Sequence, residues 1–228
     1  FAATLARHRE TLDAARRRQK ALSEASIRRW EADLDEIAVD DSDLESRTEE
    51  ATGEATSALR PLTLEERTLL DRLRRWAVRY EGAPDTKAET FLRWLESIVR
   101  PKGRWSNERV IVFTEYVATL NWLRTLLAAR GMGEEGRLGI LVGGMDSDDR
   151  EAVKAAFQAD PEESPIRILL ATDAASEGID LQAHCWRLLH YEIPWNPSRL
   201  EQRNGRIDRY GQRGNAQGEV EVFHFVDA

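Results

Sequence analysis

The stretch that decides the fold is PWNPSRLEQRNGRIDRYGQ, residues 194–212. Ser198 follows Pro197 and stands three residues before Glu201, the spacing of a capping box, so we expect a helix to start near residue 199. Gly211 can end this helix, because glycine adopts the left-handed conformation that often follows a last turn. The stretch therefore predicts one helix that reaches almost to residue 211.

Three polar side chains would share one face of this helix. Gln202, Arg206 and Arg209 are separated by four and then three residues, which is the spacing of neighbours on a helix surface. Guanidinium groups offer rigid, forked donors that suit phosphate oxygens. An ordinary surface helix with ion pairs to Asp208 is the alternative, but Gly205 favours a close approach by backbone or ligand, since glycine costs about 1 kcal/mol inside a helix.

A second polar segment, ATDAASEGIDLQ at residues 171–182, directly follows an apolar run. Thr172, Ser176 and the backbone of Gly178 can donate hydrogen bonds to phosphate oxygens, and Asp180 can accept from a ribose hydroxyl or hold an arginine. An ordinary strand-to-helix turn would explain the segment equally well when it is taken alone.

Two further loops follow apolar runs of the kind that form buried strands. Thr114 comes directly after residues 110–113, and Gly143 and Gly144 follow residues 138–142. Glycines let a backbone pass close to a sugar-phosphate chain, although a tight turn explains this pair about as well.

The order of apolar segments predicts an α/β fold. Short β-branched runs alternate with helical patterns after residue 107, which is typical of a parallel sheet covered by helices on both faces. The expected strands are 110–113, 138–142, 166–171, 187–191 and 220–226. Ligands of such sheets bind at the carboxyl ends of the strands, where all four polar segments would lie.

The first part of the chain reads as a helical extension. Residues 1–30 have helical periodicity, and residues 31–50 carry ten acidic residues against Arg47 alone. Two amphipathic helices follow, with capping boxes predicted at Thr63 and at Thr86. We expect the apolar stripes of both helices to pack into a core; they are Leu69, Leu70, Leu73, Trp76, Ala77 and Tyr80, and Phe91, Leu92, Leu95, Ile98 and Val99.

Taken in order, these segments resemble the C-terminal RecA-like lobe of superfamily-two helicases, and most of all its Swi/Snf-like branch. Residues 110–115 resemble motif IV of that family, residues 171–181 motif V and residues 202–212 motif VI. The sequences DAASEG and GRIDR resemble bacterial members, which include RapA-like remodellers and the helicases of phage-defence systems such as DISARM. The resemblance covers residues 86–228 and leaves residues 1–85 as a helical extension or insertion.

The resemblance implies a role for each motif residue. Arg209 would be the arginine finger on the γ-phosphate of ATP, with Arg206 as its companion and Gln202 helping to place both. Gly178 and Asp180 would face the nucleotide. The tracked nucleic-acid strand would lie along Thr114, Thr172, Ser176, Gly143 and Gly144. Motif V departs from its relatives at two positions: Glu177 stands where many of them have arginine, and Asp180 stands where some have asparagine.

The chain contains no G-x-x-x-x-G-K-[ST] phosphate loop and no D-E-x-x carboxylate pair in a strand context. It begins at Phe1, so a missing motif can stand upstream. We therefore expect ATP and Mg²⁺ to be held mainly by an N-terminal RecA-like lobe of the same protein. The chain alone should not hydrolyse ATP.

Composition narrows the remaining choices. The net charge of −8 argues against a broadly basic nucleic-acid binder, so contacts must be local. Cys185 is the single cysteine and the histidines lack metal-ligand spacing, so we expect no disulfide and no side-chain metal site. No apolar run is long enough to cross a membrane and no leader is visible. With its single cysteine, the chain fits a reducing, cytoplasmic setting best.

Three functions fit this pattern. The first is the second lobe of an ATP-dependent double-stranded DNA translocase. The second keeps the motor lobe but acts on RNA or single strands. The third is a protein-binding module, in which the helical extension docks a partner and the motor half is inert. A phosphate loop and a carboxylate pair upstream of Phe1 would favour the first two.

Overall fold

The structure is a computed structural model of the 228-residue chain. It describes residues 46, 62–80, 82–134, 136–173, 180–194, 196–212, 214 and 218–226. The helix expected over residues 1–30 lies outside the described residues, and so does almost all of the acidic segment 31–50. The chain divides into two compact units; helix α4 belongs to the first, which ends at Ala83, and the sheet belongs to the second, from Pro84 onward.

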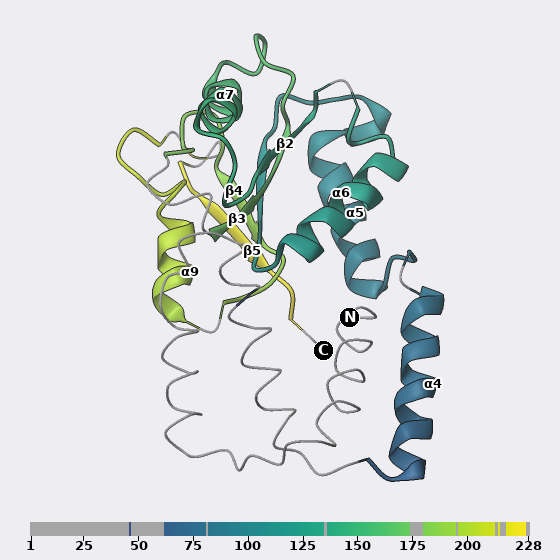
Figure 1. The fold of residues 1–228 in the computed structure, drawn as a ribbon. Coiled ribbons are helices and arrows are strands. Elements are labelled where there is room, and N and C mark those ends of the chain that lie inside the picture. The colour runs from purple at the N-terminus through teal and green to yellow at the C-terminus, as the bar shows by residue number, and fades with distance from the viewer. Residues whose placement is uncertain are drawn as a thin grey trace. The chain divides into compact units, whose positions relative to one another are not determined.

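The second unit is built on a sheet of five parallel strands in the order β2-β3-β1-β4-β5 (Figure 1). The strands are β1 (Val110–Thr114), β2 (Leu138–Leu141), β3 (Ile168–Thr172), β4 (Arg187–His190) and β5 (Glu221–His224). Every residue of β1 and β3 is buried, as their unbroken apolar sequences require of central strands. The predicted α/β fold with a parallel sheet is confirmed.

Helices cover both faces of this sheet (Figure 1). Helices α5 (Thr86–Val99) and α6 (Val117–Ala129) pack on one face, where Phe91 and Leu123 meet Val112 in one apolar cluster. Helix α7 (Ser147–Gln158) lies on the other face, which also carries α9 (Pro197–Asn204). A short 3₁₀ turn, η2 (Pro101–Gly103), follows α5.

The two amphipathic helices before the sheet differ in how far their apolar side chains are buried. In α5, Phe91, Leu92, Leu95 and Val99 are fully buried, as predicted. In α4 (Leu64–Tyr80), only Ala77 is buried. The prediction that the α4 stripe packs into a core is therefore wrong for four of its large side chains, whereas Leu70 is partly buried; those exposed are Leu69, Leu73, Trp76 and Tyr80.

The helix starts show which capping predictions hold. At α4 the capping box is confirmed, because the Thr63 amide donates to Glu66 Oε2 (2.8 Å) and the Glu66 amide donates to Thr63 Oγ1 (3.3 Å). At α5 the cap is Asp85, whose carboxylate accepts from the Ala88 amide (2.7 Å), so the box predicted at Thr86 is wrong. The carboxylate one residue earlier already satisfies a free amide of the first turn.

A buried arginine, Arg109, ties together the loops at the amino ends of the strands. Arg109 donates to the carbonyl oxygens of Ile166 (3.1 Å), Ala159 (2.6 Å) and Phe157. Burial, and then the charge of Arg167, lower the pKa of Arg109 to about 10. Because its acceptors are backbone carbonyls, Arg109 stabilises the positions of these loops.

Within the part of the chain that the structure describes, none of the helices is long and apolar enough to cross a bilayer.

Candidate nucleotide-contact site at the carboxyl edge of the sheet

The five strands end at one edge of the sheet. Their register aligns Leu141, Ala171, Phe113, His190 and His224 in a single row across β2, β3, β1, β4 and β5. The loops that follow the strands therefore leave the sheet at the same level. The polar segments that the sequence singles out therefore begin at one edge, where parallel sheets bind their ligands.

Helix α9 begins one residue after Asn196, two residues earlier than predicted. The side chain of Asn196 accepts from the Ser198 amide (2.9 Å), and Pro197 occupies the first helical position. The capping box predicted between Ser198 and Glu201 is therefore wrong. Asparagine is among the strongest N-caps, and proline at the first position has its φ already set for a helix.

The helix also ends earlier than predicted, at Asn204. Gly205 is its C-cap, and the amides of Arg206 and Ile207 bond back three residues, in turns. The prediction that Gln202, Arg206 and Arg209 share one helical face is therefore wrong, because only the first of them lies on α9. The chain turns here because it packs: Ile207 is fully buried in the core on this face of the sheet.

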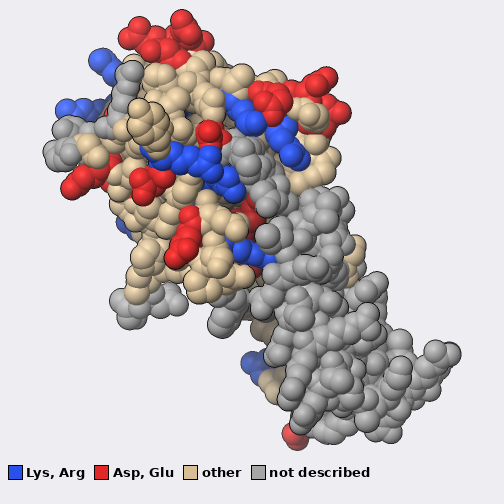
Figure 2. Space-filling view, turned by 90° about the vertical axis from the view of Figure 1, so that its left-hand side faces the viewer, with Lys and Arg blue, Asp and Glu red and all other residues tan. Residues whose placement is uncertain are grey.

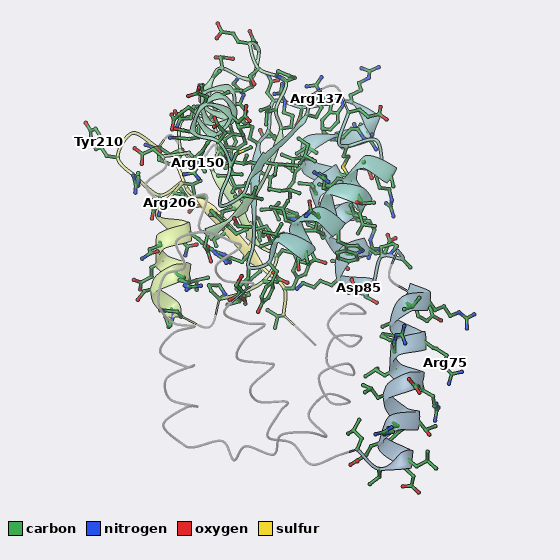
Figure 3. The ribbon with its side chains drawn as sticks, viewed as in Figure 1. Arg75, Asp85, Arg137, Arg150, Arg206 and Tyr210 are labelled. Carbon is green, nitrogen blue, oxygen red and sulfur yellow. The ribbon has the colours of Figure 1, made fainter. Side chains whose placement is uncertain are left out.

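Arg206 is almost completely buried. Only 7% of the residue is exposed, and its carbonyl oxygen accepts from the Leu181 amide (3.0 Å). That bond joins the segment after α9 to the end of the 171–182 segment, so two predicted motifs are neighbours in space. Figure 3 shows Arg206 close to α9, with the fully exposed Tyr210 projecting away from the sheet beyond it.

Arg209 is the more accessible of the two arginines, with 41% of its side chain exposed. Its Nε donates to the carbonyl oxygen of Gly205 (2.7 Å), and its Nη1 forms an ion pair with the carboxylate of Asp180, which is itself half exposed. The structure thus brings together two predicted site residues that stand far apart in the sequence. Gln202 is exposed on α9.

Sequence reasoning missed Arg203, which is only 1% exposed. Its Nε and Nη2 donate to the two carboxylate oxygens of Asp173 (2.5 and 2.7 Å), and its Nη1 donates to the carbonyl oxygen of Glu192 (2.7 Å). The guanidinium carbon lies 5.4 Å from the centre of the Phe113 ring. One buried side chain of α9 thereby contacts the chain at the ends of β1, β3 and β4.

A signal for Arg203 was present in the sequence. Asp173 directly follows the buried strand β3, and a carboxylate at such a place needs a cationic or donor partner. A paired, forked contact between arginine and carboxylate is the strongest partner available.

His190 completes the polar contacts of α9 with the sheet. Its Nε2 hydrogen-bonds Asn204 Oδ1 (2.9 Å), and the residue is almost completely buried. Burial lowers the pKa of His190 to about 4; the hydrogen bond to Asn204 raises the pKa and the nearby charge of Arg203 lowers it. His190 is therefore neutral at physiological pH.

A second carboxylate, Glu192, ties the loop after β1 to the loop after β4. Its Oε2 accepts from the Glu115 amide (2.8 Å) and its Oε1 accepts from the Thr119 hydroxyl (2.9 Å). The pKa of Glu115 is raised, chiefly by burial, while Arg203 acts in the opposite direction and Glu192 adds to the rise. This part of the edge is shaped by internal hydrogen bonds.

The residues predicted to follow a nucleic-acid strand are only partly accessible. Thr114 and Thr172 are partners in the register of β1 and β3, and both are fully buried. Gly144, at the edge strand, is exposed with φ +76°, and nothing lies within 4 Å of the place a Cβ would take. Ser176 and Gly178 lie outside the described residues.

The surface that carries α9 has mixed charge. Figure 2, which looks onto this side, shows Lys and Arg side chains interspersed with Asp and Glu. Among the residues that the structure describes, no group of three or more His, Cys, Asp or Glu is arranged to hold a metal ion. Any anion contact here depends on individual guanidinium groups.

A parallel five-stranded sheet with helices on both faces, and with a buried arginine–carboxylate pair at its carboxyl edge, is typical of a RecA-like lobe. The family described as the helicase conserved C-terminal domain matches residues 90–211, more than half of the chain. The chain belongs to this family, as the C-terminal RecA-like lobe of a superfamily-two helicase.

Known proteins agree with this assignment. The uncharacterized ATP-dependent helicase YqhH of Bacillus subtilis is 40% identical over 106 residues, which are 46% of this chain and 17% of YqhH. The RNA polymerase-associated protein RapA of Yersinia enterocolitica is 35% identical over 111 residues, which are 49% of this chain and 11% of RapA. The chain thus spans less than a fifth of either relative.

Among solved structures, the C-terminal part of the Fun30 ATPase domain has the same fold. The match has a TM-score of 0.53 at 21% identity and covers 88% of this chain and 60% of the Fun30 chain.

Proposed function

We propose that this chain is the second motor lobe of an ATP-dependent translocase that moves along double-stranded DNA. The observation that carries the proposal is the exposure of Arg209 and its single ion pair among the described residues. Its guanidinium is partly exposed in the turn after α9 and is held by one exposed carboxylate, that of Asp180. An exposed ion pair contributes only about 0–1 kcal/mol, so a nucleotide phosphate can replace Asp180 as the partner of Arg209.

The other predicted contacts are arranged around this finger. Arg206 is three residues before Arg209 and almost fully buried; it would support the same phosphates, with Gln202 on the exposed face of α9. Gly178 and Asp180 would face the nucleotide. Gly144 offers an open backbone for a sugar-phosphate strand, whereas Thr114 and Thr172 would have to become exposed before their hydroxyls could contact it.

The residues present fit part of a site for ATP with Mg²⁺. Arg206, Arg209 and Gln202 supply hydrogen-bond donors for phosphate oxygens, and the described residues hold no carboxylate group suited to the metal. Magnesium would neutralise charge on the phosphates from a first RecA-like lobe. This chain would supply the arginines and exclude water from one side of the nucleotide.

The relatives support a motor function. YqhH is named an ATP-dependent helicase, RapA is named as RNA polymerase-associated, and the Fun30 match is part of an ATPase domain. Duplex DNA as the track and a place in antiviral defence stay predictions from the sequence resemblance, and a cytoplasmic location stays a prediction from the composition.

The test is duplex-stimulated ATP hydrolysis by a protein that carries both motor lobes. Changing Arg209→Ala should lower kcat by about 10³-fold or more, because the finger acts on charge that develops on the transferred phosphoryl group. Arg124→Ala is the matched control, since Arg124 is an exposed arginine on α6, away from the strand ends. Unchanged turnover in the Arg209→Ala protein would exclude Arg209 as the finger.

A further inference from the structure

Helix α4 exposes a stripe of large apolar side chains. Leu69, Leu73, Trp76 and Tyr80 are 60, 42, 57 and 49% exposed, and the rings of Trp76 and Tyr80 are in contact (centroids 5.4 Å apart). Their spacing of four, three and four residues is that of the seam by which one helix packs along another. The stripe is therefore shaped for a helical partner.

The apolar stripe borders a groove on α4, and arginines line that groove as well. Arg72, Arg75 and Arg79 lie beside the apolar stripe, and the residues described along the groove include no carboxylate. None of the three forms an ion pair with the described residues; Arg79 lies over the Tyr80 ring, and Arg75 donates to the Asp71 carbonyl oxygen (3.3 Å). Figure 3 shows Arg75 projecting from α4. Among the described residues, the groove thus combines an apolar stripe with arginines that have no carboxylate partner.

We propose that this face of α4 docks an amphipathic helix of a partner protein, with leucine-type side chains on the stripe and carboxylates against Arg72, Arg75 and Arg79. Burial of the apolar stripe would supply affinity, and the carboxylates would fix the choice and register of the partner. This goes beyond the motor function, because it gives the helical extension a binding role of its own.

Other occupants fit the surface less well. A second copy of α4 would set arginines against arginines, which is unfavourable across an interface. A nucleic-acid strand would use the arginines but would leave Leu69 and Leu73 in water. A bilayer surface would demand a wider apolar face than this narrow seam, and the chain as a whole is negatively charged.

The proposal can be tested with the whole 228-residue chain and two synthetic helical peptides of three heptads. Both peptides carry leucine at the seam positions; one carries glutamate at the flanking positions and the other carries lysine. In fluorescence anisotropy the glutamate peptide should bind at least about tenfold more tightly than the lysine peptide, because each flanking charge either pairs or clashes with an arginine.

Variants of α4 separate the two parts of the surface. Trp76→Ala should weaken the glutamate peptide by about tenfold or more, as loss of a central aromatic anchor does. The double change Arg72→Glu with Arg79→Glu should invert the preference toward the lysine peptide. Arg74→Glu is the matched control: it makes the same charge change on the same helix, outside the groove, and should leave the preference unchanged.

Several outcomes would overturn the proposal. They are equal binding of both peptides, no binding by a chain whose circular dichroism shows it to be folded, and a preference that survives the double charge reversal. Dimerisation that Trp76→Ala abolishes would assign the groove to a second copy of the chain. Binding to anionic vesicles or to duplex DNA that depends on Trp76 would assign the groove to those ligands instead.

Discussion

Helix α9 and the turn that follows it contain two arginines, six residues apart, that differ in burial and in the number of their partners. Arg203, on the helix, is buried and makes three hydrogen bonds to Asp173 and Glu192. Arg209, in the turn, is partly exposed and has Asp180 as its carboxylate partner. The first guanidinium cannot leave its partners without breaking the packing of α9 on the sheet, whereas the second can exchange its partner for a ligand.

This difference separates a residue that holds the site together from one that can act in it. A buried charge must keep its partner, because an unpaired charge in the protein interior is strongly destabilising. An exposed ion pair is nearly neutral in free energy, so its arginine remains available. Both residues are arginines of the same sequence segment, so residue type alone does not show which of them is buried.

The largest effect on stability should come from breaking the buried contact. Arg203→Met should lower the free energy of unfolding by about 3 kcal/mol, because it removes the buried cation that donates to Asp173 and to the Glu192 carbonyl. Arg209→Ala should change it by no more than about 0.5 kcal/mol, as at other surface positions. Urea unfolding followed by circular dichroism measures both values.

A double mutant sharpens this comparison. Removing the charge of Asp173 as well, in Asp173→Asn with Arg203→Met, should restore part of the lost stability, since the negative charge that Arg203 balanced is then also removed. Equal stability of the Arg203→Met and Arg209→Ala proteins would contradict the distinction between the two arginines.

A smaller effect on stability should come from the titration of His190, which lies beside Arg203. The pKa of His190 is about 4 in the folded chain and about 6.5 when unfolded, so the unfolded chain binds the proton more readily. Its contribution to stability is complete above pH 6.5 and is lost as the pH falls toward 4, by about 2 kcal/mol between pH 7 and pH 5.

Substitution of the histidine tests this assignment. His190→Gln keeps a side chain able to bond Asn204 and has no titrating group, so its stability should fall less over the same pH range. Parallel curves for the two proteins would show that His190 does not titrate as described.

Much of the fold could be predicted because strong local patterns agreed with the tertiary structure. The β-branched run at 110–113 and the runs at the other four strands were long and apolar enough to identify a buried parallel sheet. Periodicity could not identify what covers a helix: the stripes of α4 and α5 look alike in the sequence, yet Leu95 is buried and Leu73 is exposed. A helical pattern shows that a face is apolar but not that a partner lies within the same chain.

The site was harder to predict, because its geometry depends on contacts between distant segments. A continuous helix to Gly211 would have been regular, but the burial of Ile207 and the bond from Leu181 to the carbonyl of Arg206 favour a turn after Asn204. The pairing of Arg209 with Asp180, and of Arg203 with Asp173, joins residues about 30 apart. Such pairings follow from the strand order, which a single sequence does not display.

ATP hydrolysis by this chain alone, beside the same assay on a protein carrying both motor lobes, tests the central claim most directly. Each is measured with and without duplex DNA. The account predicts no turnover by the chain alone and DNA-stimulated turnover by the two-lobe protein, because the arginines complete a site whose phosphates and metal are held by the other lobe. Turnover by the purified chain alone would contradict it, since a complete nucleotide site would then lie within these 228 residues.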